Sequence, residues 1–124
     1  MVGAFIVASV LFGAGCYKVT TVDLTSNAVL DREISFSRDL LPIFESRCAL
    51  SGCHSPGNQV PDLSDARAYE SLVREDLINF EDPQNSELYD WLTGKRTPAM
   101  PLGGSDPDIN IVVLTWLSQG AQNN

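Results

Sequence analysis

The sequence predicts a small all-α domain. Its last segment carries apolar residues at the i, i+3, i+4, i+7 and i+8 spacing of an amphipathic helix, namely Ile109, Val112, Val113, Trp116 and Leu117. An earlier segment places Leu40, Leu41 and Phe44 on one helical face. No stretch of the chain sustains the two-residue alternation of a half-buried strand, so helices alone are expected to form the core.

The first helix of the domain is expected to run from Asp39 to about Arg47. Asp39 has the side chain of an N-cap residue. Pro42 would then fall in the first turn of the helix, where its missing N–H group has no intrahelical partner to lose. This helix leads the chain directly into Cys48.

Capping residues and glycines mark three further helices. Residues 64–75 begin at Ser64, residues 86–93 begin at Ser86 and stop before Gly94, and the last helix begins at Ser105 or Asp106 and ends at Gly120. Pro107 suits the first turn of the last helix. The connecting segments 55–64 and 95–106 are rich in proline and glycine, which indicates loops.

The first sixteen residues differ from the rest of the chain. They contain no charge and form an apolar run of signal-peptide length, shorter than the ~20 residues of a membrane-spanning helix. The residues Gly13-Ala14-Gly15-Cys16 resemble a bacterial lipobox. We therefore expect residues 1–15 to be a signal peptide of lipoprotein type, Cys16 to carry the lipid, and residues 16–33 to form a tether to the membrane.

Acidic residues outnumber basic ones by 16 to 8, which gives a formal charge of −8. This balance excludes nucleic acid as a partner, because the chain has too few cations to neutralise a run of phosphates. An acidic surface suits docking on a basic protein partner.

The segment Arg47-Cys48-Ala49-Leu50-Ser51-Gly52-Cys53-His54 contains two of the three cysteines and the only histidine. In an exported protein the pair Cys48 and Cys53 is not expected to remain as free thiols. A disulfide, a metal site and covalent haem attachment are the three alternatives. A structural zinc ion prefers four ligands, and the domain has no fourth cysteine or histidine.

Haem attachment usually has two residues between the cysteines, whereas four separate them here. The adjacency of Cys53 and His54 is intact, and Gly52 tolerates the positive φ that a bulge between the cysteines needs. Met100 lies between Pro98 and Pro101 on an expected loop, which makes it the candidate second axial ligand.

Residues 36–54, FSRDLLPIFESRCALSGCH, resemble the haem-attachment segment of a group of small bacterial monohaem c-type cytochrome domains. Later parts of the chain resemble the same group in order: residues 83–89, PQNSELY; the Met100-Pro101 pair; and residues 116–121, WLSQGA. The resemblance covers residues 34–121 and implies a cytochrome c-like domain over 34–124, with four short helices around one covalently bound haem c. In that fold the first and last helices cross beside the haem, so Phe44 and Trp116 are the expected contact pair.

The resemblance also implies roles for the site residues. Cys48 and Cys53 would form the haem thioethers, His54 would be the proximal iron ligand and Met100 the distal one. The expected function is electron transfer, without a catalytic residue, by a lipid-anchored protein on the periplasmic side of a bacterial membrane or at the cell surface. Redox proteins, including a larger respiratory or oxidoreductase complex, are the expected partners.

Two other functions remain open at this stage. One is a haem-free interaction module in which Cys48 and Cys53 form a disulfide. The other is a haem protein with an open iron position that senses a small ligand.

Overall fold

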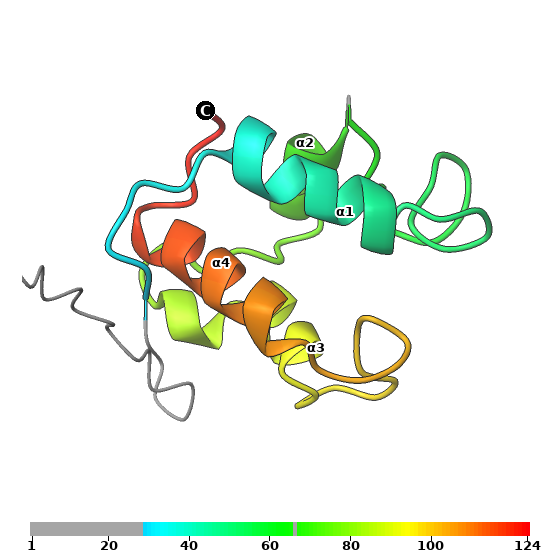
Figure 1. Cartoon of the computed structure of the whole chain (residues 1–124). Coiled ribbons are helices and arrows are strands. Elements are labelled where there is room, and N and C mark those ends of the chain that lie inside the picture. Colours follow the sequence, from blue (N-terminus) through cyan, green and yellow to red (C-terminus); the bar gives the residue numbers. More distant parts are fainter. Residues whose placement is uncertain (1–28, 66) are drawn as a thin grey trace, which may run out of the picture.

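The computed structural model describes residues 29–65 and 67–124. This part of the chain contains helices and loops and no strand, which confirms the all-α prediction (Figure 1). The helical segments are the π-helix η1 (Phe36–Leu40), α1 (Leu41–Arg47), α2 (Ala68–Arg74), the 3-10 helix η2 (Pro83–Asn85), α3 (Glu87–Leu92) and α4 (Pro107–Ser118). The predicted signal peptide, Cys16 and the tether up to residue 28 lie outside the described residues.

The first helical segment begins at Ser35, so the predicted N-cap Asp39 is wrong. The Ser35 hydroxyl accepts a hydrogen bond from the Arg38 N–H, and the Asp39 carboxylate accepts one from the Ser35 N–H at 2.8 Å. Pro42 lies in the first turn of α1, as predicted, although the helical run already begins with η1 at Phe36. The wider π turn of η1, closed by a bond from the Leu41 N–H to the Phe36 carbonyl, directly precedes this proline.

The second helix also begins later than predicted. Ser64 does not cap it, because the Ser64 hydroxyl donates to the Asp62 carboxylate at 2.6 Å instead. The N–H groups of Arg67 and Ala68 both donate to the Ser64 carbonyl, which forms a turn before α2 begins at Ala68.

The last two helices follow the prediction closely. Ser86 occupies the predicted N-cap position of α3, although its side chain makes no capping hydrogen bond, and Gly94 follows that helix with a φ of 78°. The Asp106 carboxylate caps α4 by accepting from the N–H groups of Asp108 and Ile109, and Pro107 occupies its first turn.

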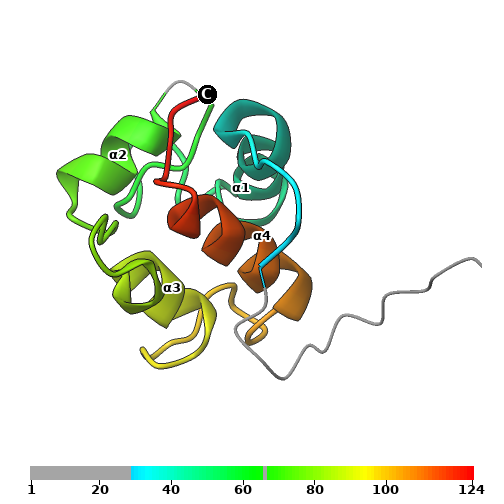
Figure 2. The ribbon, with the colours of Figure 1, turned by 90° about the vertical axis from the view of Figure 1, so that its left-hand side faces the viewer.

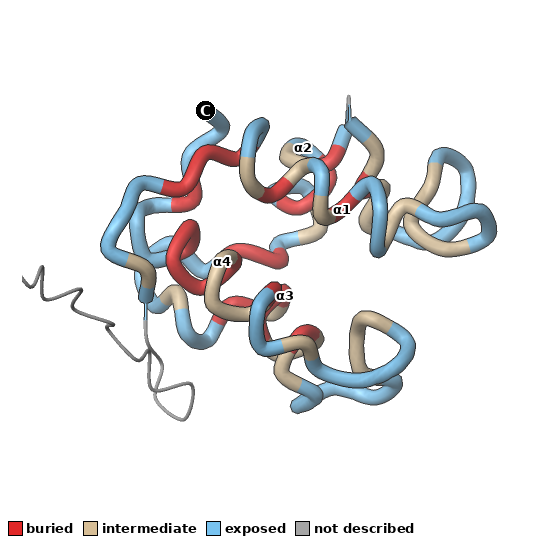
Figure 3. Tube along the Cα trace, viewed as in Figure 1, coloured by how far each residue is buried: buried red, intermediate tan, exposed pale blue. Residues whose placement is uncertain are grey.

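The core lies where the helices face one another. Figure 2 shows α1, α2 and α3 arranged around α4, and Figure 3 places the buried positions on their facing sides. Trp116 of α4 is buried, and its ring centroid lies 5.4 Å from that of Phe36. The first helical segment therefore meets Trp116 through Phe36, which in turn contacts Phe44 at 6.0 Å. Tyr69 of α2 completes this aromatic cluster, 5.3 Å from Phe36 and 6.2 Å from Trp116.

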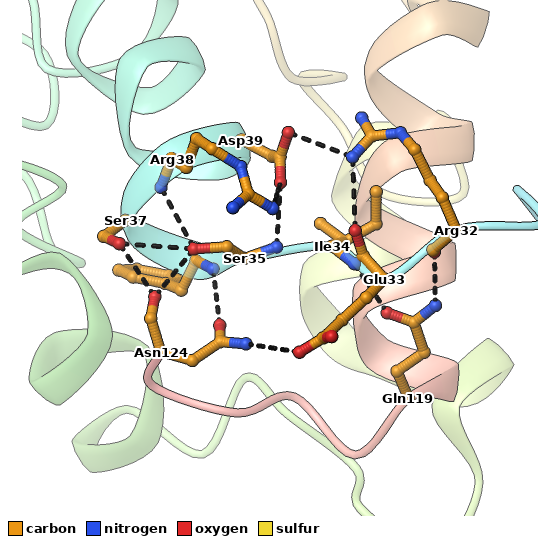
Figure 4. Close-up of polar contacts among 10 residues, drawn as sticks. Arg32, Glu33, Ile34, Ser35, Ser37, Arg38, Asp39, Gln119 and Asn124 are labelled. Carbon is orange, nitrogen blue, oxygen red and sulfur yellow. Dashed lines mark hydrogen bonds and ion pairs between the residues drawn. The ribbon is translucent and has the colours of Figure 1, made fainter.

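The segment before η1 is bound to α4 and to the chain's last residues. The Leu30 N–H donates to the Thr115 hydroxyl at 2.8 Å. The Gln119 side chain accepts from the Ile34 N–H and donates to the Arg32 carbonyl, as Figure 4 shows. Residues 30–33, which were expected to belong to the tether, are thus part of the folded structure; the boundaries of the signal peptide and of the tether stay predictions.

Candidate functional site

The two cysteines and the histidine lie on a loop that begins where α1 ends. The N–H groups of both Cys48 and Ala49 donate to the Phe44 carbonyl, which terminates the helix. The His54 N–H then donates to the Cys48 carbonyl at 3.1 Å, so the backbone returns to its starting point after six residues. Gly52 has a φ of 80°, as the predicted bulge requires.

Both thiols of this loop are half-buried and free, so the structure contains no disulfide between Cys48 and Cys53. Burial raises the pKa of Cys48 to about 11, because the apolar surroundings penalise the thiolate. The charge of a Cys53 thiolate raises the same pKa further, whereas the Arg47 guanidinium lowers it.

His54 is half-buried, and its ring is oriented by a backbone carbonyl. The Nδ1 atom lies 2.9 Å from the Pro61 oxygen. A carbonyl oxygen can only accept a hydrogen bond, so Nδ1 carries the proton in this contact, and in the neutral imidazole Nε2 then has the lone pair. This is the tautomer that a metal-ligating imidazole needs.

Residues 59–63 run beside the cysteine–histidine pair and hold it in place. The Gln59 N–H donates to the Cys53 carbonyl at 2.9 Å, and the Leu63 N–H donates to the His54 carbonyl at 2.8 Å. Leu63 is buried in the core, which anchors residues 59–63 to the helices. We call this segment the histidine strap.

Met100 lies on the irregular loop between α3 and α4, half-buried. Its N–H donates to the Trp91 carbonyl at 3.0 Å, which joins the loop to α3. Figure 1 shows that this loop and the loop after α1 leave the helices on the same side of the molecule. The two loops are connected at their bases, because Arg47 at the end of α1 forms an ion pair of 3.1 Å with Asp106, the N-cap of α4.

The cations beside Met100 are neutralised by acids of α3. Lys95 pairs with Asp90 at 2.9 Å and Arg96 pairs with Glu87 at 3.4 Å. The Arg96 guanidinium also lies 5.9 Å from the centroid of the Trp91 ring. These contacts fix the turn that leads into the Met100 loop.

A zinc site finds no support in the described part of the chain. No three His, Cys, Asp or Glu side chains there are placed to hold a metal ion together.

A cavity of about 300 Å³ lies away from the cysteines, near the chain's last residues, and is lined by Glu33, Ile34, Trp116, Gln119, Gln122 and Asn124.

The structure thus brings Cys48, Cys53 and His54 together on one closed loop and places Met100 on a second loop tied to its base. Sequence reasoning missed Pro61, whose contribution is a backbone carbonyl, and the ion pair of Arg47 with Asp106.

No helix in residues 29–65 and 67–124 has the length and apolar character needed to cross a bilayer. No protein-family model, curated protein or solved structure matches this chain.

Proposed function

We propose that this chain is an exported monohaem cytochrome c that carries one electron at a time between redox proteins. The observation that carries the proposal is the hydrogen bond from His54 Nδ1 to the Pro61 carbonyl, which leaves Nε2 available to an iron atom beside two free cysteines.

The residues of the loop fit haem c. Cys48 and Cys53 would hold the group through two thioether bonds, and His54 would be the proximal ligand. Bound haem c would supply an iron centre that accepts and releases one electron. The bulge at Gly52 lets the two cysteines remain neighbours although four residues separate them.

The surrounding residues support this assignment in physical terms. The Pro61 carbonyl holds the imidazole in one orientation and raises its basicity, as partners of metal-bound histidines do. The helical core, built around Trp116 and Phe36, gives the loop a rigid base and excludes water from one side of it. Met100 is the proposed distal ligand, because it lies on the neighbouring loop with its backbone held by α3.

The location and partners form a second part of the proposal. Lipid on Cys16 would hold the domain on the periplasmic side of a bacterial membrane or at the cell surface, and the tether would let it reach redox partners, including a larger respiratory or oxidoreductase complex. The formal charge of −8 favours partners with a basic docking patch. Electron transfer to such a partner should slow as salt is added, because salt screens the attraction of exposed charges.

Expression in a haem-maturing host tests the function. The wild-type protein should be red, and its haem should stay with the protein through acid–acetone extraction. Cys48→Ala and Cys53→Ala should each leave the haem attached by a single thioether bond. His54→Ala should change the absorption spectrum, because it removes the proximal iron ligand. A colourless wild-type protein would refute the proposal.

Two matched variants separate its parts. Met100→Ala should abolish the weak far-red band of methionine-ligated ferric haem and leave the haem attached; retention of that band would show that Met100 is not the ligand. Cys16→Ser should keep the haem and abolish incorporation of radiolabelled palmitate into the protein. A Cys16→Ser protein that still incorporates the label would contradict lipid attachment at Cys16 alone.

A further inference from the structure

The peptide group that joins Pro61 to Asp62 is held at both ends. Its oxygen accepts from His54 Nδ1 at 2.9 Å. Its N–H belongs to Asp62 and donates to the hydroxyl of Ser71 at 2.8 Å. Because the C=O and N–H of a trans peptide lie in one plane and point in opposite directions, the two bonds extend through a single rigid unit. A chain of hydrogen bonds therefore connects the imidazole to α2.

Ser71 lies in the middle of α2 and is completely buried. A serine in the interior of a helix gains little for helix stability. Its hydroxyl accepts the Asp62 N–H and also a bond from Arg74 at 3.3 Å, so both lone pairs have a partner. The histidine strap is thereby attached to a helix that packs in the core.

The neighbouring contacts keep this strap in register. The Asp62 carboxylate accepts from the Ser64 N–H at 3.1 Å and from the Ser64 hydroxyl at 2.6 Å. The Leu63 N–H bonds the His54 carbonyl at 2.8 Å. Rotation of the 61–62 peptide plane, which would turn the Pro61 oxygen away from the imidazole, is opposed directly by the bond to Ser71 at its other end.

We propose that Ser71 is a positioning residue for the His54 imidazole and that it acts through the 61–62 peptide. The Ser71 bond fixes the direction of the Pro61 carbonyl. It also polarises the peptide, because hydrogen bonds in a chain strengthen one another. A more negative carbonyl oxygen makes His54 a stronger electron donor to whatever metal its Nε2 binds.

The effect on an iron centre rests on the proposed function. A stronger donor ligand stabilises the ferric form and lowers the reduction potential. Loss of the Ser71 hydroxyl should therefore raise the potential. The effect on the imidazole itself does not depend on haem, because the hydrogen bonds are made entirely by this chain.

The test uses the full chain from a haem-maturing host and the variants Ser71→Ala and Ser71→Thr. His54 is the only histidine, so its imidazole nitrogen signals identify themselves. In the reduced protein, Ser71→Ala should speed exchange of the Nδ1 proton with water on the order of tenfold, the loss of about one hydrogen bond. Its reduction potential should rise, and Ser71→Thr, which restores a hydroxyl, should return both readouts toward wild type.

Ser86→Ala is the matched control. Ser86 is also completely buried, and its hydroxyl also accepts a backbone N–H, that of Asn79 at 3.0 Å. The control should lose comparable stability and leave the His54 proton exchange unchanged. Unchanged exchange in Ser71→Ala, or equal acceleration in Ser86→Ala, would overturn the proposal.

The proposal stays testable if Ser71→Ala does not fold or if the protein contains no haem. If Ser71→Ala does not fold, Ser71→Cys replaces it; sulfur is a weak acceptor, so exchange should again be faster than in wild type, and wild-type exchange would overturn the proposal. If the wild-type protein contains no haem, the proposed function fails. The exchange comparison on the haem-free chains then still decides whether Ser71 positions His54.

Discussion

Asp106 has two separable roles, and replacing it should resolve them. Its carboxylate caps α4 by accepting from Asp108 and Ile109 at 3.1 and 3.3 Å. The same carboxylate pairs with Arg47 at 3.1 Å, which joins the loop of the cysteines to the loop of Met100. Asp106→Ala removes both roles, whereas Asp106→Asn keeps a capping oxygen and removes the charge.

The expected costs follow from the geometry. Loss of the cap should cost about 1 kcal/mol of unfolding free energy. The Arg47 ion pair is worth about 0.5 kcal/mol, because the arginine side chain is 52% exposed and solvent screens the pair. The charge of Asp106 near the helix N-terminus adds about 0.5 kcal/mol through the helix dipole. Asp106→Ala should therefore lose about 2 kcal/mol and Asp106→Asn about 1 kcal/mol.

Urea denaturation of the purified variants measures these costs, with two single-role controls. Arg47→Gln removes only the ion pair and should cost about 0.5 kcal/mol. Asp108→Asn removes an exposed first-turn charge of the same helix and should cost about 0.5 kcal/mol through the dipole alone. The difference between Asp106→Asn and wild type should shrink in about 1 M salt, where the screening length is about 3 Å.

The comparison has a clear point of failure. If Asp106→Asn costs as much as Asp106→Ala, the two cap bonds contribute nothing, and the assignment of Asp106 as the N-cap is wrong in energetic terms. If Arg47→Gln alone accounts for the whole loss, the ion pair and not the cap holds the start of α4.

Three other predictions concern the site loop and the core. Gly52→Ala should lower the free energy of unfolding by about 1–2 kcal/mol in urea titrations, because Gly52 has a φ of 80°. Gly103→Ala, at a position without a positive φ, should be nearly neutral, and equal losses in the two variants would contradict the bulge. In haem-free protein, the folded state holds the Cys48 proton to about pH 11 and the unfolded state releases it near 9.0, so stability should fall as pH rises through that interval. Cys48→Ser should lessen this fall in thermal melts, and an undiminished fall would refute the assignment; part of the fall remains in the variant, because burial also raises the pKa of Tyr89. Trp116→Ala should cost about 3–5 kcal/mol by urea denaturation because the indole is completely buried, and a loss below about 1 kcal/mol would contradict its central place in the core.

Local patterns were sufficient for much of the helical framework. The last helix, with Asp106 as one of its two candidate caps and a stop near Gly120, was predicted and is confirmed, but Leu114 and Thr115 are buried as well, so the buried face of α4 is wider than the predicted stripe. The positive φ of Gly52 was predicted as well, because a bulge between two neighbouring cysteines needs it. These features depend on residues within one or two turns of one another, which is the range over which sequence spacing specifies contacts.

Which residue caps the first two helices depended on contacts that the sequence pattern does not show. Ser35, not Asp39, begins the first helical segment, and its hydroxyl also donates to the Asn124 carbonyl at 3.0 Å. Ser64 fails as a cap because Asp62 takes its hydroxyl. Asp39 and Ser64 both have side chains that can cap a helix. Hydrogen bonds to a further residue, Asn124 for Ser35 and Asp62 for Ser64, determined which side chains form the caps.

The candidate site residues could be proposed from the sequence alone, since Cys48, Cys53 and the single histidine are chemically distinctive and lie within seven residues of one another. Their geometry could not. The bond from His54 to the Pro61 carbonyl uses a backbone atom, which every residue has and no pattern marks. The support from Ser71 and the ion pair of Arg47 with Asp106 join elements distant in sequence, so they exist only once the helices have packed.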